Sequence, residues 1–306
     1  MLKKIKNYLL NTKLVLAVFS FAKKIVLPGF EKMPLYDVMV FFIKGIRKGS
    51  IETRASSLAF FFFLAIFPSI IFLFTLIPYI PIKDFQDQLM DVIKNFMPHS
   101  VYEATEDTLS EIIKRQNGGL LSIGFISALY FSTNGFNAMI NVFNQTSHSL
   151  ETRTPFMTRM ISILLVLILS TLLVVAIALL VFSEIVLNYF HFLGSFEAYL
   201  IIAGRWVIIF ALFFCIISFI YYLGPASKLG WKFVTAGSTL ATILSLLTSW
   251  GFAFYVNNFG QYNKIYGSIG TLIVMLMWIY FNSYILLLGF ELNASIHNAK
   301  SVGKNN

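Results

Sequence analysis

The chain has 306 residues, of which 58% are hydrophobic, 17% are aromatic and only 12% are charged. Soluble domains carry about 25% charged residues, and a soluble protein of this size has no means of hiding so much apolar surface. The composition therefore excludes a soluble enzyme and indicates a protein embedded in a membrane. The formal net charge of +9 would also fit a nucleic-acid-binding protein, so the positions of the basic residues have to decide its meaning.

The N-terminal segment, residues 1–56, is basic and is expected to be cytoplasmic and interfacial. Its start imitates a signal peptide, because three lysines precede an apolar stretch at 14–22 whose end resembles a cleavage site. Lys23 and Lys24 follow at once, and cleavage would leave this basic neighbourhood on the wrong side of the membrane. An uncleaved interfacial segment is the preferred interpretation, and cleavage of residues 1–22 remains the alternative.

Residues 35–49 predict an amphipathic helix that leads into the first span. Leu35, Val38 and Phe42 belong to an apolar face at helical spacing, while Lys44 and Arg47 lie on the opposite face. Such a helix is expected to rest on the inner leaflet.

Six stretches are long and apolar enough to cross a bilayer, whose hydrocarbon core of about 30 Å needs about 20 residues of helix. The third is the most apolar, and the second is the weakest because polar residues interrupt it. The predicted fold is all-α: a polytopic membrane protein with about six transmembrane helices and additional amphipathic interfacial helices. The transmembrane domain covers 57–293, and a cytoplasmic tail follows at 294–306. The six stretches are 57–80, 119–142, 161–183, 200–223, 235–256 and 271–291.

The connection at 81–118 is long for a loop without structure. Two sets of apolar residues recur in it at helical spacing on either side of Pro98. We expect two short amphipathic helices on the outer surface.

The basic residues lie mainly on one side of the predicted spans. Summed over alternate connections, Lys and Arg number 17 on the side of the termini and 5 on the other side. The positive-inside rule therefore places both termini in the cytoplasm. The excess of positive charge is then explained by the anionic inner leaflet, and no nucleic-acid partner is expected.

One face of the second span carries polar side chains. Ser127, Tyr130, Asn134, Asn137 and Asn141 follow three- and four-residue spacing, which places them in one stripe. A hydrated substrate path and hydrogen bonding between helices both explain such a stripe, and both interpretations stay open.

The fifth and sixth spans also carry polar faces. The small residues of the fifth, from Thr235 to Ser249, favour close helix packing. In the sixth, Tyr280, Tyr284 and Glu291 align, and Glu291 is expected near the cytoplasmic end, within reach of the interface.

Arg205 and Glu184 are the other ionisable residues within or bordering the spans, both near the outer ends of their helices. They could pair, Arg205 could extend to the outer interface, or Arg205 could bind an anionic head group.

No catalytic constellation is present in the sequence. It contains no phosphate-binding loop, no paired-histidine zinc motif and no Cys-x-x-Cys, and its single cysteine is Cys215. The four histidines are scattered. We therefore expect no cofactor, no metal and no enzymatic activity.

Several stretches together resemble the YihY/BrkB family of bacterial inner-membrane proteins from about residue 35 to 295. They are GPA at 224–226, WKFVTAG at 231–237, FYVNNF at 254–259, YGSIG at 266–270, WIY at 278–280, LGFELNA at 288–294, RASSLAFF at 54–61 and FPS at 67–69. The resemblance implies six helices with both termini inside, and no agreed catalytic residues. Members have been labelled ribonuclease BN, a label regarded as a misassignment, and some carry a virulence label. Phe60-Phe61 and Phe290 depart from the usual pattern.

The leading hypothesis is a transporter or lipid-handling protein. It would move an amphipathic or anionic envelope component along a groove formed by the polar faces of the second and last spans. The residues expected along this path are Asn134, Asn137, Asn141, Arg205, Tyr280, Tyr284 and Glu291. The alternatives are a membrane scaffold or virulence-associated envelope protein without transport, and a ribonuclease.

Overall fold

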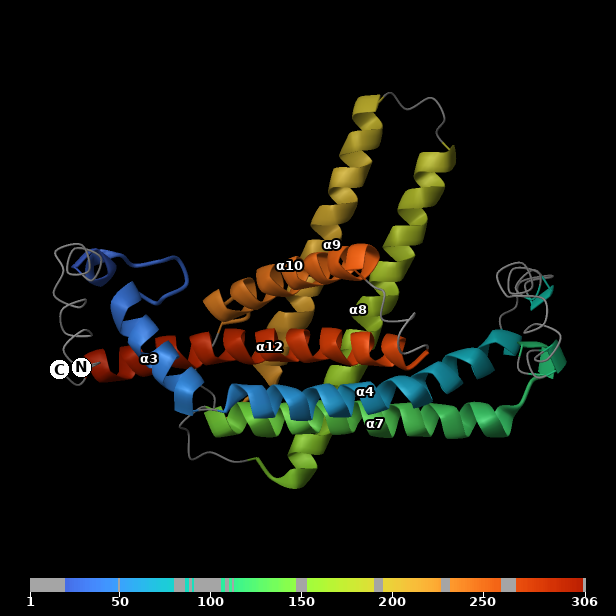
Figure 1. The fold of residues 1–306 in the computed structure, drawn as a ribbon, viewed down its shortest axis with the longest axis horizontal. Coiled ribbons are helices and arrows are strands. Elements are labelled where there is room, and N and C mark those ends of the chain that lie inside the picture. Colours follow the sequence, from blue (N-terminus) through green and yellow to red (C-terminus); the bar gives the residue numbers. More distant parts are fainter. Residues whose placement is uncertain are drawn as a thin grey trace. The chain divides into compact units, whose positions relative to one another are not determined.

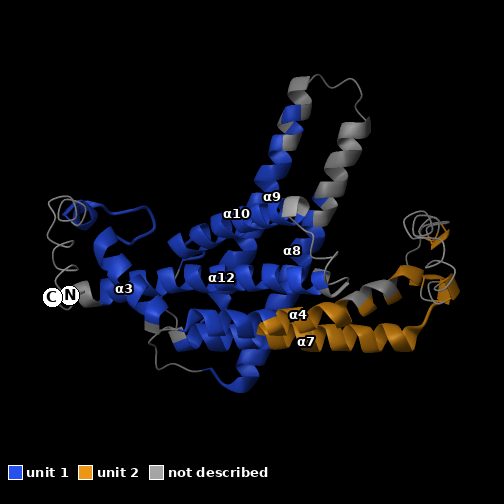
Figure 2. Ribbon diagram, viewed as in Figure 1, with its two compact units in different colours: residues 1–59, 137–306 blue, residues 60–136 orange. Residues whose placement is uncertain are grey.

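The computed structural model describes residues 20–48, 50–79, 113–146, 153–189, 195–226, 232–259 and 268–304, with a few helical residues between 86 and 111. These described residues form helices and turns and include no strand, as the all-α prediction requires. The chain divides into two compact units, one formed by residues 1–59 and 137–306 and the other by residues 60–136 (Figure 2).

Long helices coincide with all six expected spans (Figure 1). Their apolar composition and length follow directly from the hydropathy of the sequence. They are α4 (Ile51–Leu76), α7 (Gly118–Thr146), α8 (Pro155–Tyr189), α9 (Ser195–Leu223), α10 (Ala236–Phe259) and α12 (Ser268–Lys304).

Five of the described helices are both long and apolar enough to cross a membrane, so the multi-pass prediction is confirmed. The exception is α7, whose 29 residues have the length but not the apolar composition. It coincides with the expected second span, the weakest of the six. The five candidate spans are Ile51–Ser69, Pro155–Ala176, Ala203–Leu223, Ala236–Val256 and Leu272–Ser301.

Two helices extend beyond the apolar stretches that predict them. Helix α4 begins at Ile51, and α12 continues to Lys304, so most of the expected tail at 294–306 forms the last turns of α12. The 37 residues of α12 rise by roughly 56 Å at 1.5 Å per residue, well beyond a hydrocarbon core of about 30 Å. Its final turns have a protein neighbour in α3, which hydropathy does not reveal.

The amphipathic helix expected at 35–49 is present as α3 (Leu35–Lys48). Its Val38 is fully buried in a cluster with Phe30 and with Leu292 and Ile296 of α12. Met39 and Ile43, on the same predicted apolar face, remain exposed. The apolar side of α3 is therefore divided between α12 and the surroundings of the protein.

Within the larger unit, α10 packs against α12 and α9, and α8 packs against α9 (Figure 1). The backbones of α10 and α12 approach most closely at Gly237 and Gly289, where a methyl group on Gly237 would overlap the carbonyl oxygen of Gly289. Beside this contact, Ser238 and Thr242 are fully buried. The packing interpretation of the fifth span is therefore confirmed.

In the smaller unit, residues 60–76 of α4 and 118–136 of α7 run antiparallel. Phe62 contacts Phe136 near one end, and Phe72 contacts Phe125 near the other, with ring centroids 5.7 and 5.4 Å apart. Gly124 allows the approach, because a Cβ there would lie 3.2 Å from the Cα of Phe72.

Some expectations fall on residues outside this description. They include the segment at 1–19, most of the outer connection at 81–118 and the side chain of Glu184. Of that connection, the structure describes a few helical residues and a 2.7 Å ion pair between Lys114 and Asp87.

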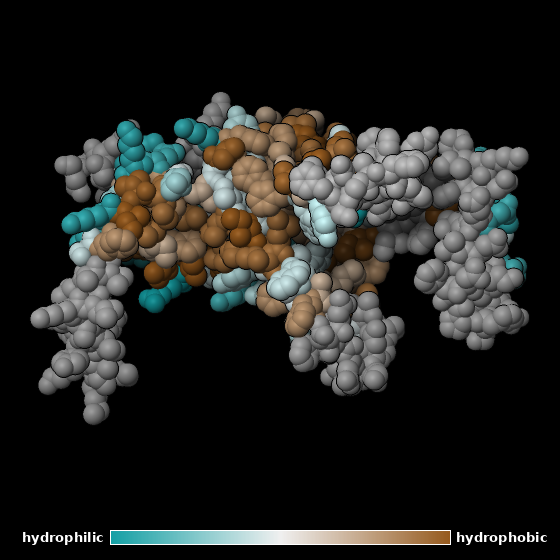
Figure 3. Space-filling view, turned by 90° about the horizontal axis from the view of Figure 1, so that it is seen from above, coloured by the Kyte–Doolittle hydropathy of each residue, from teal (hydrophilic) through white to brown (hydrophobic). Residues whose placement is uncertain are grey.

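Hydrophobic side chains cover much of the visible described surface, and hydrophilic residues gather at the end that carries α3 (Figure 3). This distribution is typical of helices that lie in hydrocarbon and end at a polar interface.

Candidate functional site

The most unusual surface of the described helices is one face of α7. It begins with Ile123 and Ile126, which are 65% and 64% exposed, and continues through Tyr130, which is 54% exposed. It ends with the half-buried Asn137 and the exposed Asn141. We name this surface, with the half-buried Asn134 included, the α7 face. It spans 19 residues, and the rise from the first to the last is roughly 27 Å at 1.5 Å per residue.

The polar end of the α7 face lies opposite a fully buried apolar side of the same helix. Met139, Ile140 and Phe143 have no exposed surface. A helix that meets only lipid shows the reverse arrangement, since hydrocarbon cannot satisfy amide groups. The α7 face therefore requires water, head groups or another polypeptide beside it.

Helix α8 provides the contrast. Over the part of α8 whose side chains are described, the large exposed side chains include the apolar Leu167 at 56% and Val174 at 64%. Its exposed Thr171 satisfies its own hydroxyl by donating to the carbonyl oxygen of Leu167 at 2.8 Å. This surface of α8 suits hydrocarbon. Exposed amide side chains are therefore a feature of α7 that α8 does not share over its described part.

Glu291 of α12 is covered by α3 and does not extend freely to an interface. Its side chain is 7% exposed, and a Cβ added to Gly45 of α3 would overlap its carboxylate. Arg54, at the start of α4, interacts with it electrostatically. A buried carboxylate needs such a partner, so Glu291 joins the end of α3 and the start of α4 to α12.

The other sequence-predicted residues do not gather around Glu291. The rings of Tyr280 and Tyr284 are neighbours on α12, tilted by 39° with their centroids 6.3 Å apart. Arg205 is half-buried on α9, 16 residues before Tyr221, which is roughly 24 Å along the helix. Because Tyr221 bonds to α12 at Leu286, Arg205 lies far from the end of α12 that holds Glu291.

Sequence reasoning missed an aromatic cluster between α7, α9 and α12. Phe143 and Phe290 stack with centroids 4.0 Å apart and planes at 5°, and Tyr221 meets both rings edge-on. The Tyr221 hydroxyl donates to the carbonyl oxygen of Leu286 at 2.6 Å. The departure from the family pattern at Phe290 was the signal for this cluster, since a large side chain there needs a partner.

Asn293 ties α12 to the start of α10. Its Oδ1 accepts from the backbone N–H of Gly237 at 2.8 Å, and its Nδ2 donates to Thr235 Oγ1 at 2.9 Å. Thr235 in turn accepts from the N–H of Ser238 at 3.0 Å, as a helix N-cap does. The first turn of α10 is therefore fixed by α12.

Arg153, just before α8, caps the C-terminal end of α9. Its guanidinium donates to the carbonyl oxygens of Leu223 and Gly224 at 2.9 and 3.0 Å, which have no helical partner of their own. Burial lowers the pKa of Arg153. Close by in sequence, Asn144 accepts from the N–H of Ala226 at 2.8 Å.

Among the described residues, no group of three His, Cys, Asp or Glu side chains could hold a metal ion. Several polar side chains of the described part of the chain, among them Asn293 and Arg153, instead bind backbone or one another.

These features define a multi-pass, all-α membrane protein. The family model for virulence factor BrkB matches residues 42–306, and the chain belongs to this family. No solved structure matches the chain.

Curated relatives carry two kinds of name. The chain is 34% identical over 258 residues to the putative ribonuclease-like protein YfkH of Bacillus subtilis. This match covers 83% of the chain and 93% of YfkH. It is 29% identical over 252 residues to the UPF0761 membrane protein Smlt0865 of Stenotrophomonas maltophilia. That match covers 79% of this chain and 56% of the longer relative. The UPF0761 membrane protein XCC0860 of Xanthomonas campestris matches over the same fractions of the two chains.

Proposed function

We propose that this protein handles an amphipathic or anionic lipid, or a similar envelope component, by guiding its polar part along the α7 face. No catalytic step, cofactor or metal is part of this proposal. The observation that carries it is the amide surface of the half-buried Asn137 and the exposed Asn141, on a helix whose opposite, apolar side is buried.

The physical argument starts from the cost of amides in hydrocarbon. A polar group without a hydrogen-bond partner there costs several kcal/mol, roughly 2–7 depending on the reference. The amides of Asn137 and Asn141 are therefore stable beside water or polar head groups, or against another chain. A lipid that crosses a bilayer needs such a polar track for its head group while its acyl chains stay in hydrocarbon.

The gradient along the α7 face fits an amphipathic molecule better than an ion. Ile123 and Ile126 supply an apolar end, Tyr130 has both an apolar ring and a polar hydroxyl, and the asparagines follow. Neutral amides and a phenol recognise polar groups by hydrogen bonding without binding one charge tightly. Loose binding of this kind allows a substrate to leave as well as to enter.

We place the protein in the cytoplasmic membrane with both termini in the cytoplasm. The support is the distribution of Lys and Arg, 17 against 5 across alternate connections. Reporter fusions at the two ends are expected to report the same, cytoplasmic side, and opposite sides would contradict the topology.

A lipid-movement assay tests the function. The protein is reconstituted into vesicles, and the transfer of a fluorescent phospholipid between leaflets is followed by quenching from outside. The Asn134→Leu/Asn137→Leu variant is expected to slow transfer at least tenfold. The matched control is Thr171→Val, which removes a hydroxyl from the lipid-suited surface of α8 and should leave transfer unchanged.

Two outcomes would reject the proposal. Equal transfer by wild type and the double asparagine variant would show that the α7 face does not guide the lipid. Transfer no faster than in protein-free vesicles would favour a scaffold in which the α7 face meets another chain. Cleavage of RNA by the purified protein would instead favour the ribonuclease activity that the name of the Bacillus relative suggests.

A further inference from the structure

A separate cavity of about 500 Å³ opens between residues 26–32, the start of α10 and the later turns of α12. This volume lies in the usual range for small-molecule sites, roughly 300–1,000 Å³. The cavity belongs wholly to the larger unit and includes no residue of the α7 face. An inference about it is therefore independent of the proposed function.

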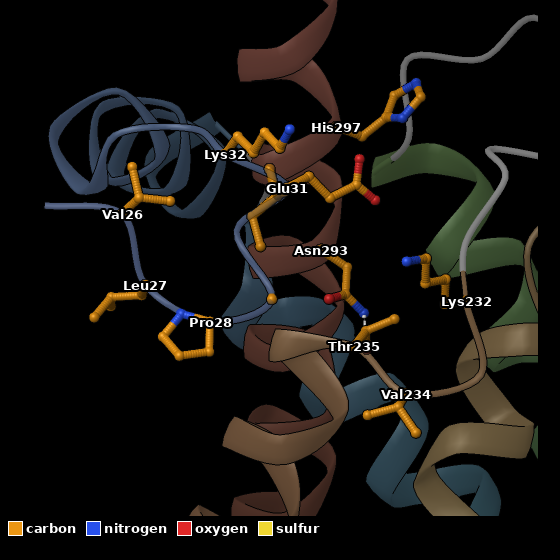
Figure 4. A pocket seen from close by; sticks show the side chains of 12 residues that line it. Val26, Leu27, Pro28, Glu31, Lys32, Lys232, Val234, Thr235, Asn293 and His297 are labelled. Atoms are coloured by element: carbon orange, nitrogen blue, oxygen red, sulfur yellow. Dashed lines mark hydrogen bonds between the residues drawn. The ribbon is translucent and has the colours of Figure 1, made fainter.

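The polar side of the cavity is basic. Lys32 and Lys232 line it from opposite sides, and in the view of Figure 4 the carboxylate of Glu31 lies between their ammonium groups. Glu31 also lines the cavity, but its carboxylate is bound by Lys300. In the part of the chain that the structure describes, no carboxylate forms an ion pair with Lys32 or Lys232. An anion would therefore find two ammonium groups available.

The start of α10 is not the source of this attraction. Its amides at Gly237 and Ser238 already donate to Asn293 and Thr235. Asn293 and Thr235 also bond to each other, as the dashed line in Figure 4 shows. The two lysines, rather than a helix dipole, are the recognition elements.

The other side of the cavity is apolar and open. Val26, Leu27 and Val234 line it and are 49%, 40% and 61% exposed. Contact of these apolar side chains with water would be unfavourable, whereas the acyl chains of a lipid would cover them.

The depth of the cavity in the membrane follows from the helices that form it. The candidate span of α10 begins at Ala236, directly after Val234 and Thr235, and that of α12 ends at Ser301, shortly after His297. The cavity therefore lies where two spans reach the polar interface, at the level of lipid head groups.

The loop that carries Lys32 has a fixed shape. Glu31 and Lys32 adopt left-handed backbone conformations with φ of 49° and 70°, which side chains rarely occupy. Gly29, with φ of 83°, lies against Ala236, where a Cβ would come within 3.2 Å of the alanine methyl. The contact at Gly29 thus holds this loop against the start of α10.

We propose that this cavity binds the phosphate of an anionic phospholipid between Lys32 and Lys232, with the lipid's glycerol and acyl chains lying along Val26, Leu27 and Val234. A soluble phosphate would use the lysines but not the apolar side. A zwitterionic lipid would use the apolar side, but its own cation would oppose the two lysines.

Titration of the purified full chain in non-ionic detergent with dioctanoyl phosphatidylglycerol tests this proposal. Each lysine near an anionic lipid contributes roughly fivefold to affinity, so Lys32→Gln/Lys232→Gln is expected to weaken binding roughly 25-fold. Lys32→Arg/Lys232→Arg should retain most of the affinity. The charge-matched control is Lys24→Gln/Lys44→Gln, which changes two exposed lysines outside the cavity and should weaken binding less than twofold.

Titrations with two other ligands distinguish an anionic lipid from a zwitterionic lipid and from free phosphate. Dioctanoyl phosphatidylcholine and inorganic phosphate are each expected to bind at least tenfold more weakly than phosphatidylglycerol. Inorganic phosphate that bound as tightly as the lipid would overturn the assignment to a lipid. An equal loss in the Lys24/Lys44 control would show that general surface charge, rather than the cavity, attracts the lipid, and would also overturn it.

Discussion

The contact between α10 and α12 at Gly237 gives the sharpest test of how the helices are held together. In Gly237→Ala the new Cβ would overlap the carbonyl oxygen of Gly289 and lie 2.6 Å from Asn293 Oδ1. Ordinary van der Waals contact begins near 3.4 Å, so α12 must withdraw or Asn293 must turn away. Overpacking of this kind costs about 1–3 kcal/mol, and loss of the Gly237–Asn293 hydrogen bond adds about 1 kcal/mol.

Gly251→Ala is the matched control on the same helix, because nothing lies within 4 Å of its added Cβ. Alanine is favoured over glycine in a helix by about 1 kcal/mol, so both variants gain this amount. The two should therefore differ by about 2–4 kcal/mol, with Gly237→Ala the less stable. Thermal unfolding in detergent, followed by tryptophan fluorescence, should show a Tm several degrees lower for Gly237→Ala. Equal Tm values would refute the close backbone approach.

Three further substitutions test the other contacts. Tyr221→Phe removes the donor to Leu286 and should cost about 1 kcal/mol, seen as a small fall in Tm; an unchanged Tm would contradict the bond. Arg153→Gln should cost about 1.5–3 kcal/mol and Arg153→Lys less, because a charged donor to two carbonyls is lost or reduced; equal Tm for both variants and wild type would refute this role. Gly45→Val should detach α3 from Glu291 and speed protease cleavage within 35–48, and unchanged cleavage would refute the contact.

The helices could be predicted well because hydrocarbon imposes a simple rule on sequence. About 20 consecutive apolar residues need a helix, and the five most apolar stretches indeed form candidate spans. The ends were harder to place. The extension of α12 to Lys304 depends on packing against α3, and the pairing of Val38 with Leu292 and Ile296 has no signal in hydropathy.

The candidate site was predictable only in part. The stripe from Tyr130 to Asn141 follows from helical spacing alone, so the α7 face was visible in the sequence. Its exposure was not, because spacing does not say which side of a helix is covered. The aromatic cluster at Phe290 and the lysine cavity join residues more than 60 positions apart, and a single sequence contains no direct record of such contacts.

Water access to the α7 face is the most direct test of the account. In a Cys215→Ser background, single cysteines at Tyr130, Asn134, Asn137 and Asn141 are exposed to a membrane-impermeant thiol reagent in intact vesicles. Cysteines at Leu167 and Val174, on the exposed apolar surface of α8, serve as controls. We expect fast labelling of the asparagine positions and little labelling on α8. Protection of all four α7 positions, at the level of the α8 controls, would contradict a hydrated track.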